Sequence, residues 1–122
     1  RISLKKRLAE KYSNVFKDCS EIEFLKNIAN THSNYWLSTI ILDKSSTIDR
    51  EYLRLHLESE NIESRPVWKP MHIQPIFKNN KSYTNGISED LFNRGLCLPS
   101  GTNITKKELD KVIKAIKCIY ED

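Results

Sequence analysis

Apolar residues recur at three- and four-residue steps near the N-terminus of the chain. This spacing predicts an amphipathic helix, because residues so spaced share one face, with lysine and arginine between them. The apolar face comprises Leu4, Leu8, Tyr12, Val15 and Phe16. The segment that follows, residues 20–30, lacks this period and predicts a short helical or irregular connector.

The same period predicts a second long helix near the C-terminus. Thr105 and Glu108 form a capping box, in which the hydroxyl and the carboxylate each accept a hydrogen bond from a backbone amide at the helix start. The apolar face comprises Leu109, Val112, Ile113, Ile116 and Tyr120. The opposite face carries Lys107, Lys111 and Lys114, which we interpret as a solvated surface.

Two shorter helices are predicted in the middle of the chain. The run STID at residues 46–49 is typical of a helix start, because it places an acidic residue in the first turn. Asn61 ends this helix, whose inward face comprises Tyr52, Leu53, His56 and Leu57. Ser88, followed by two acidic residues, predicts the cap of a shorter helix through Leu91 and Phe92.

Apolar runs between these helices predict strands. The best of them, residues 34–42 (NYWLSTIIL), is rich in aromatic and β-branched residues and becomes continuously apolar, as expected of a strand buried on both faces. Shorter strands are predicted from Ile62 to Arg65, ended by Pro66, and from Leu96 to Pro99. The alternation of helices and strands predicts an α/β or α+β layer, with helices packed on a small sheet.

The segment from Pro66 to Phe77 contains three prolines, which exclude regular structure. It is nevertheless apolar and aromatic, which predicts a structured loop that packs against another surface. Arg65, Lys69 and His72 lie close to Trp68 in this stiff segment, and such residues can hold anionic groups and stack on a planar base. A loop that only packs against a neighbouring domain explains the same composition, so both interpretations stay open.

Composition excludes several classes of protein. With 39% hydrophobic and 30% charged residues, the chain is typical of a globular domain, and no apolar window is long enough to cross a membrane. The net charge of +4 is spread along the chain, whereas nucleic-acid binders concentrate basic residues on one face. The only methionine is Met71 and the chain begins at Arg1, so we expect a piece of a longer protein.

Motifs for metal binding or catalysis are missing from the sequence. The three cysteines, Cys19, Cys97 and Cys118, form no CxxC pair, so we expect free buried thiols in a reducing compartment and no zinc site. The chain has no HExxH, GxSxG, GxGxxG or P-loop motif. The residues alone therefore indicate a binding loop on an incomplete α/β domain.

A resemblance to a known family extends this interpretation. Residues 65–77 (RPVWKPMHIQPIF) and 91–105 (LFNRGLCLPSGTNIT) resemble the C-terminal region of the DegT/DnrJ/StrS sugar-nucleotide aminotransferases. Residues 34–37 (NYWL) and 61–65 (NIESR) also fit that region. The resemblance covers essentially the whole chain, and the motif RPxWKPMHxQP is long and unusual.

The resemblance implies a fold and a division of the chain. Enzymes of this family are homodimers of the aspartate-aminotransferase fold, fold type I, with a large N-terminal and a small C-terminal domain. The chain, residues 1–122, resembles the small domain alone. Residues 1–30 resemble the interdomain helix and connector, and residues 31–122 the α/β small domain.

The resemblance also implies an activity for the full-length parent. That enzyme would use pyridoxal phosphate to transfer an amino group from glutamate to a nucleotide-linked keto-deoxy sugar. UDP-4-keto-6-deoxy-N-acetylhexosamine fits best, for surface polysaccharide or glycan biosynthesis in the cytoplasm. The large domain supplies the Schiff-base lysine and most cofactor contacts, so the chain alone is expected to be inactive, with no catalytic residue, cofactor ligand or metal ligand.

Substrate-binding roles follow by matching positions in the motif. Lys69 and His72 are expected to make polar contacts to the sugar nucleotide, Trp68 and Met71 to shape the wall of the cleft, and Arg65 to hold the loop or reach a phosphate. The alternatives are a non-catalytic binding module with a basic surface and a dimerisation fragment whose proline loop only packs.

Overall fold

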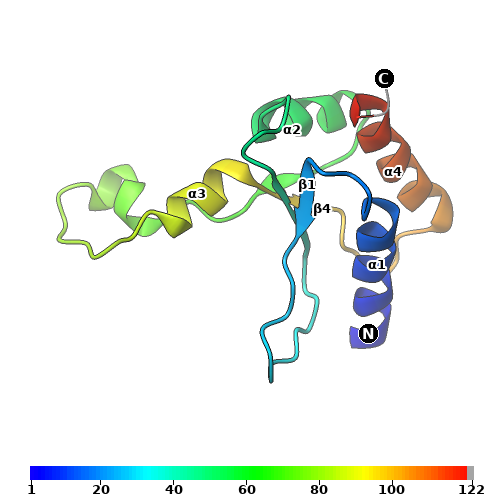
Figure 1. Cartoon of the computed structure of the whole chain (residues 1–122), viewed down its shortest axis with the longest axis horizontal. Helices are drawn as coiled ribbons and strands as arrows, with labels where there is room; N and C mark the ends of the chain where they lie inside the picture. The colour runs from blue at the N-terminus through cyan, green and yellow to red at the C-terminus, as the bar shows by residue number, and fades with distance from the viewer. Residues whose placement is uncertain (121–122) are drawn as a thin grey trace.

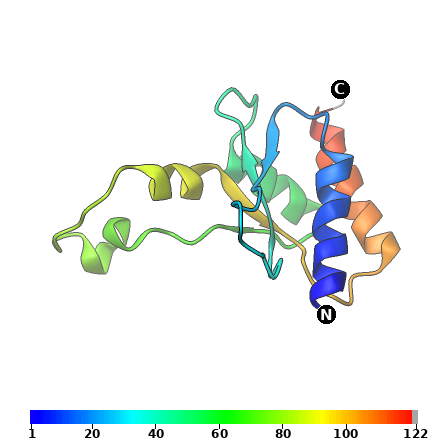
Figure 2. The same cartoon turned by 60° about the horizontal axis from the view of Figure 1, so that its bottom comes forward.

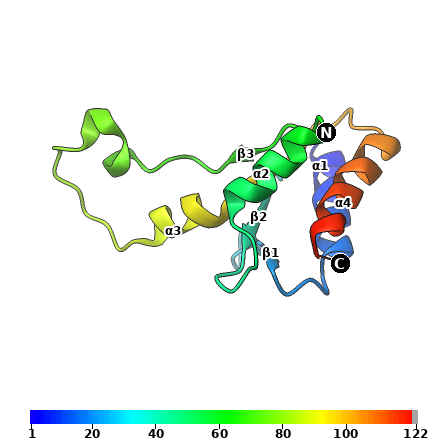
Figure 3. The same cartoon turned by 90° about the horizontal axis from the view of Figure 1, so that it is seen from above.

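The computed structural model describes residues 1–120 and places four α-helices about a small antiparallel sheet (Figure 1). The two long helices lie side by side at one end of the molecule, and α2 lies near them (Figures 1 and 3). This arrangement confirms the predicted fold of helices packed on a short sheet. The helices are α1 (Ile2–Val15), α2 (Arg50–Ser59), α3 (Ile87–Arg94) and α4 (Lys106–Tyr120).

The sheet has the strand order β1-β2-β4-β3, and all its neighbours are antiparallel. In the central pair Ser38 lies opposite Leu98, and Ile40 lies opposite Leu96. This register turns the apolar side chains of both strands toward the same core as the helices. The strands are β1 (Ile22–Phe24), β2 (Ser38–Leu42), β3 (Arg65–Pro66) and β4 (Gly95–Leu98).

The hydrophobic core lies between the central strands and the three longest helices. The periodic residues of α4 contribute to it as the sequence predicts, and so do Leu8, Tyr12 and Phe16. The prediction was wrong for Leu4 and Val15, which are 43% and 37% exposed. The Tyr12 hydroxyl donates a hydrogen bond to the Pro99 carbonyl (3.0 Å). Burial in this core raises the pKa of the Tyr12 phenol. The largest fully buried side chains are Tyr12, Ile40, Leu53, Leu57, Leu96 and Ile116.

The start of α2 differs from the prediction. Asp49 lies just outside the helix as its N-cap, and its carboxylate accepts a hydrogen bond from the Tyr52 amide (2.7 Å). Leu53 and Leu57, four residues apart, are fully buried, whereas Tyr52 is 55% exposed. The prediction of Tyr52 as an inward residue was wrong, because the helix turns this position away from the face that the two leucines bury.

The strand predicted over residues 34–42 begins only at Ser38. Before it, the Asn34 side chain accepts a hydrogen bond from the Trp36 amide, and the Ser33 hydroxyl accepts one from the Tyr35 amide, each at 3.0 Å. Tyr35 also has a positive φ of 51°. These local side-chain bonds replace the ladder bonds of a strand, so residues 34–37 form an irregular turn instead.

Two edge strands were also placed incorrectly. Residues 20–30, predicted as a connector, contain β1, whose three residues pair with β2. The strand predicted from Ile62 to Arg65 is instead β3, and it includes Pro66. Proline is tolerated there because β3 is at the edge of the sheet, where one side needs no amide donor.

Of the two predicted helix caps described next, one is confirmed and one is wrong. The capping box of α4 is confirmed, because the Glu108 carboxylate accepts hydrogen bonds from the Thr105 amide and hydroxyl, both at 2.7 Å. The cap of α3 is not Ser88 but Gly86, which has a φ of 82°. A left-handed residue is needed where the chain turns into this helix, and glycine adopts that conformation without strain.

A long arm, residues 67–94, extends from the sheet, away from the three longer helices (Figures 1 and 2). Its outgoing limb contains the two 3-10 turns η1 (Met71–Ile73) and η2 (Pro75–Phe77), and it returns through α3. The limbs meet at Gly95, where a Cβ atom would lie 2.5 Å from the Leu91 carbonyl oxygen and 2.9 Å from a Val67 methyl carbon. Gly95 therefore allows the close approach that closes the arm. The predicted structured loop exists, but Trp68, Met71 and Ile76 are largely exposed.

The described residues contain no disulfide, and all three cysteines are free thiols as predicted. Cys97 is buried and Cys19 half-buried, but Cys118 is exposed, so the prediction of buried thiols was wrong for it. Cys118 lies in the last turns of α4, outside the stripe that packs on the core. Within residues 1–120, no helix is long and apolar enough to cross a membrane.

Replacing Ser100 with alanine should destabilise the chain. The Ser100 hydroxyl is buried, accepts a hydrogen bond from the Ser38 amide (2.8 Å) and donates one to the Leu98 carbonyl (2.7 Å). Ser100→Ala leaves that buried amide without a partner, so the free energy of unfolding should fall by about 1–3 kcal/mol. Urea unfolding of Ser100→Ala against the exposed control Ser82→Ala measures this, and equal midpoints would contradict it.

The capping box should make stability depend on pH. Hydrogen bonds from the Thr105 amide and hydroxyl hold the pKa of Glu108 below its ordinary value. Its contribution is therefore complete above the unfolded pKa, about 4.3, and is lost as pH falls through the lower folded pKa. Glu108→Gln should show a smaller fall in Tm between about pH 5 and pH 2 than the wild type. Asp110→Asn, an exposed carboxylate on the same helix, is the control, and an unchanged pH profile in Glu108→Gln would refute the assignment.

Candidate functional site

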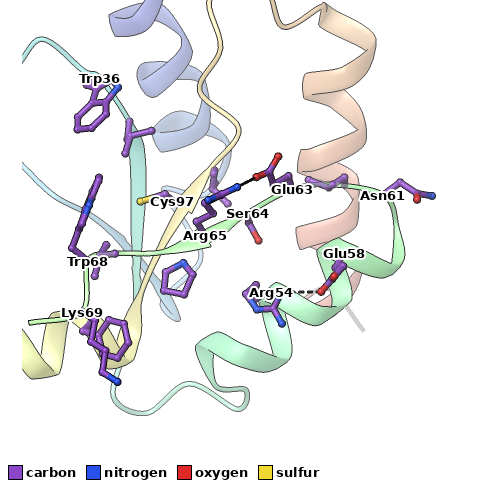
Figure 4. A pocket seen from close by; sticks show the side chains of 16 residues that line it. Trp36, Arg54, Glu58, Asn61, Glu63, Ser64, Arg65, Trp68, Lys69 and Cys97 are labelled. Atoms are coloured by element: carbon purple, nitrogen blue, oxygen red, sulfur yellow. Dashed lines mark hydrogen bonds and ion pairs between the residues drawn. The ribbon is translucent and has the colours of Figure 1, made fainter. Parts of the chain in front are cut away.

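An open groove with a volume of about 1140 Å³ lies beside β3 (Figure 4). One side comes from the turn before β2, a second from α2, and the floor from the strand edge and Cys97. The chain from Asn61 to Lys69 runs along the whole groove. Segments far apart in the sequence thus build one surface.

The structure separates the five predicted site residues into two groups. Arg65, Trp68 and Lys69 line the groove. Met71 and His72 lie beyond it in η1, on the outgoing limb of the arm. The predicted loop is therefore not a single contact surface in this chain, because its first part follows the sheet edge and its second part leaves the sheet.

Arg65 is engaged by a neighbouring carboxylate. Its guanidinium lies 2.6 Å from Glu63, and its Nε donates a second hydrogen bond to the same oxygen at 2.8 Å. Both side chains are more than 70% exposed, so this surface pair adds little to stability. Glu63 neutralises much of the charge that Arg65 brings to the groove.

Arg54, the second arginine of the groove, is also paired. It contacts Glu51 at 2.7 Å and Glu58 at 2.8 Å along one side of α2. The hydrogen bond from Arg54 lowers the pKa of Glu51, and the two carboxylates raise the pKa of Arg54. This arginine therefore fixes the surface of α2 rather than offering an open charge to a ligand.

Lys69 is the groove cation for which no ion pair occurs within the described residues. Its side chain is exposed, and its backbone carbonyl accepts a hydrogen bond from the Gln74 side chain (3.0 Å). That bond closes the loop behind the lysine and leaves the ammonium group facing solvent. A lysine held in this way acts as a point charge for an anionic ligand.

Two tryptophans form the aromatic rim of the groove. Trp36 and Trp68 have ring centroids 5.6 Å apart and planes tilted by 37°. Both remain exposed, at 62% and 67%. Figure 4 shows them along one side of the groove, with Lys69 beyond Trp68. The sequence prediction named Trp68 alone.

Trp36 was missed because the sequence pattern placed it inside a strand. Its backbone is instead fixed by the Asn34 turn and by Lys5, whose ammonium group donates to the Trp36 carbonyl at 2.9 Å. Lys5 also donates to the Ser100 carbonyl and so ties α1 to this turn. The one available signal was that the chain contains only two tryptophans.

His72 is oriented by an acidic residue on the returning limb of the arm. Its Nε2 lies 3.2 Å from a carboxylate oxygen of Glu89, in α3. The imidazole is only 19% exposed, whereas Glu89 is 44% exposed. This contact bridges the two limbs, so His72 stabilises the arm whether or not it also touches a ligand.

Ser64 adds an unsatisfied polar group to the groove wall. Its hydroxyl oxygen is shielded from solvent and has no hydrogen-bond partner among the described residues. Buried hydroxyls are nearly always paired in folded proteins, so Ser64 is an exception, and its shielded oxygen is closed to a ligand in the groove.

The groove does not by itself form a cofactor or metal pocket. Within the described residues, no cluster of histidine, cysteine and carboxylate side chains could hold a metal ion. Its lysine is exposed, whereas a Schiff-base lysine requires a dry, enclosed site. The arrangement can instead bind one side of a planar, anionic molecule.

Comparisons with known proteins agree with this picture. The model of the DegT/DnrJ/EryC1/StrS aminotransferase family matches residues 1–117. EpsN of Bacillus subtilis (strain 168), named as a pyridoxal phosphate-dependent aminotransferase, is 38% identical over 98% of this chain and 31% of its own length. A GDP-perosamine synthase from Escherichia coli O157:H7 is 30% identical over 99% of this chain and 32% of its own length. The chain thus spans about a third of these relatives.

Solved structures share the fold. An aminotransferase from Brucella abortus has a TM-score of 0.81 and 24% identity, covering 100% of this chain and 32% of its own. The Helicobacter pylori aminotransferase PseC, involved in pseudaminic acid biosynthesis, has a TM-score of 0.84 and 16% identity, covering 98% and 33%. These matches confirm that the chain has part of the type I aminotransferase fold.

The family model covers nearly the whole chain, and the relatives match it almost from end to end. The resemblance seen in the proline-rich motif is thereby confirmed. The chain belongs to the DegT/DnrJ/EryC1/StrS aminotransferase family.

Proposed function

We propose that this chain is the small C-terminal domain of a transaminase that acts on a nucleotide-linked keto-deoxy sugar. The observation that carries the proposal is a groove with an aromatic rim and an open cation, in a chain of a sugar-aminotransferase family. The whole enzyme transfers an amino group from glutamate, and its substrate is UDP-4-keto-6-deoxy-N-acetylhexosamine. Its product serves surface polysaccharide or glycan biosynthesis in the cytoplasm.

Residues 1–30 join this domain to the large domain, and residues 31–122 form the small domain itself. The exposed apolar residues at the start of α1 support this division, since Ile2 is 63% and Leu4 43% exposed. Side chains of this size are expected to be covered in the complete protein. We place α1 against the large domain.

This domain supplies one wall of the substrate cleft. Lys69 attracts the diphosphate, Arg65 orders the strand edge and lies near the same anion, and Trp68 covers a planar face. Met71 and His72 act from the arm, where Glu89 holds the imidazole in place. None of these residues performs the chemistry. They orient the substrate and exclude water from it.

Pyridoxal phosphate supplies the electron sink for amino transfer when it is bound in the whole enzyme. The groove residues do not fit a complete cofactor site, because the groove is open and its lysine is exposed. The cofactor is therefore held mainly by the large domain. The 122-residue chain alone should show no transaminase activity.

The arm supports a second role, a contact between the subunits of a homodimer. Its exposed apolar residues lie far from the core of this domain, at the end of a long projection (Figure 2). A projection of this shape is stabilised by packing against another molecule rather than by its own core. The exposed apolar residues of the arm are Met71, Ile76, Tyr83 and Ile87.

The functional proposal is tested with Lys69→Ala in the intact enzyme. Loss of an exposed charge-assisted contact should raise KM for the sugar nucleotide about tenfold and leave KM for glutamate nearly unchanged. Steady-state kinetics with both substrates measure the two values. Lys78→Ala, an exposed lysine on the arm outside the groove, is the matched control.

Two results would contradict the proposal at different levels. Equal increases in both KM values would show that Lys69 does not bind the sugar nucleotide specifically. They would not contradict the transaminase assignment. A wild-type enzyme that releases no 2-oxoglutarate from glutamate, even with pyridoxal phosphate added, would overturn the transaminase assignment itself.

A further inference from the structure

We propose that Trp36 and Trp68 together form a stacking platform for the nucleobase of a nucleoside diphosphate. The inference rests on the proposed function and deepens it in two ways. It adds Trp36 to the site, and it assigns the base end of the substrate, rather than the sugar, to this rim of the groove.

The geometry of the pair leaves ring faces open to a ligand. The two centroids are 5.6 Å apart and the planes are tilted by 37°, so the rings touch and no base fits between them. More than 60% of each residue is nevertheless exposed. A base can therefore stack on an outer face and extend the aromatic cluster.

Both tryptophans are held by the fold rather than by a free loop. Trp36 is fixed through hydrogen bonds of its amide to Asn34 and of its carbonyl to Lys5. Trp68 follows β3, and the Val67 amide donates to the Gly95 carbonyl at 3.3 Å. Ordering them for a ligand costs little conformational entropy, which is the property of a preorganised site.

The charges around the pair favour a planar anion over an apolar protein surface. Arg54 and Arg65 are neutralised by glutamates, so Lys69, next to Trp68 in the chain, is the groove cation without an ion pair among residues 1–120. An apolar partner covering the rim would bury this ammonium group without compensation, at a large desolvation cost. A diphosphate attached to the stacked base provides the missing counter-charge.

The test measures equilibrium binding of UDP, GDP and dTDP to the intact enzyme by calorimetry. Trp36→Ala should weaken all three nucleotides by about 5- to 150-fold, the range expected for loss of one base-stacking contact. Trp36→Phe should retain most of the affinity because it keeps a ring. Inorganic pyrophosphate, which has no base, should bind the wild type and Trp36→Ala equally.

Tyr52→Ala provides the matched control, because this exposed aromatic residue on α2 lies outside the groove. It should bind the nucleotides like the wild type. Lys69→Ala should show the complementary pattern, with a loss of affinity for pyrophosphate as well as for the nucleotides. Release of 2-oxoglutarate from glutamate should be unchanged in Tyr52→Ala.

Four results would overturn the platform. They are unchanged nucleotide affinity in Trp36→Ala, an equal loss for pyrophosphate, no nucleotide binding to an active wild type, and loss of dimerisation in Trp36→Ala. The last would show that the rim is covered by protein. Failure of the wild type to release 2-oxoglutarate would instead refute the proposed function, so the two failures are distinguishable.

Discussion

The antiparallel pairing of β2 with β4 is the constraint on which the rest of the structure depends. It is the central pair of the sheet, and its register sets Ser38 opposite Leu98 and carries the chain directly to Ser100. The Ser100 hydroxyl then closes the end of the ladder by accepting from the Ser38 amide. Because Trp36 lies just before β2, this one pairing also fixes the position of the groove's aromatic rim. A shift by one residue would turn one strand over relative to the other and disrupt the core and the rim together.

The same strand connects the core to the arm. Gly95 begins β4, and its missing side chain allows the Leu91 carbonyl and Val67 to approach it closely. Arg94, the last residue of α3, contacts Asp90 and donates to the Leu42 carbonyl at the end of β2. The base of the arm is thus tied to both central strands. Its tip is held mainly by the His72–Glu89 contact and exposes apolar side chains. We expect the arm to be less stable at its tip than at the sheet, because its exposed side chains make few core contacts.

The sequence predicts those parts whose signal is local. The periodicity of α1 and α4 and the capping box at Thr105 predict helices, because each depends only on neighbouring residues. β4 is also predicted as a short apolar run, although the prediction, Leu96 to Pro99, begins and ends one residue later than the strand, Gly95–Leu98. Prediction fails where contacts with residues distant in the sequence determine the local structure. β1 is a strand only because β2 offers it a partner, and Pro66 can join β3 only because that strand is at an edge. In the candidate site, Arg65, Trp68 and Lys69 share one motif, but no local pattern shows that Trp36 meets Trp68 or that His72 turns away from the groove.

The core and the groove come from different segments of the chain, and this separation bears on substrate specificity. The core residues come from periodic elements whose spacing cannot change without loss of the fold. The groove instead takes its rim and its open charge from the turn at residues 34–37 and from the chain after β3, neither of which contributes to the core cluster. Side chains there can change size, aromaticity or charge at little cost to stability. A family that aminates different nucleotide sugars can therefore keep one small-domain fold and vary this rim. In this chain, that part of the groove carries two exposed tryptophans and Lys69, which has no ion pair within residues 1–120.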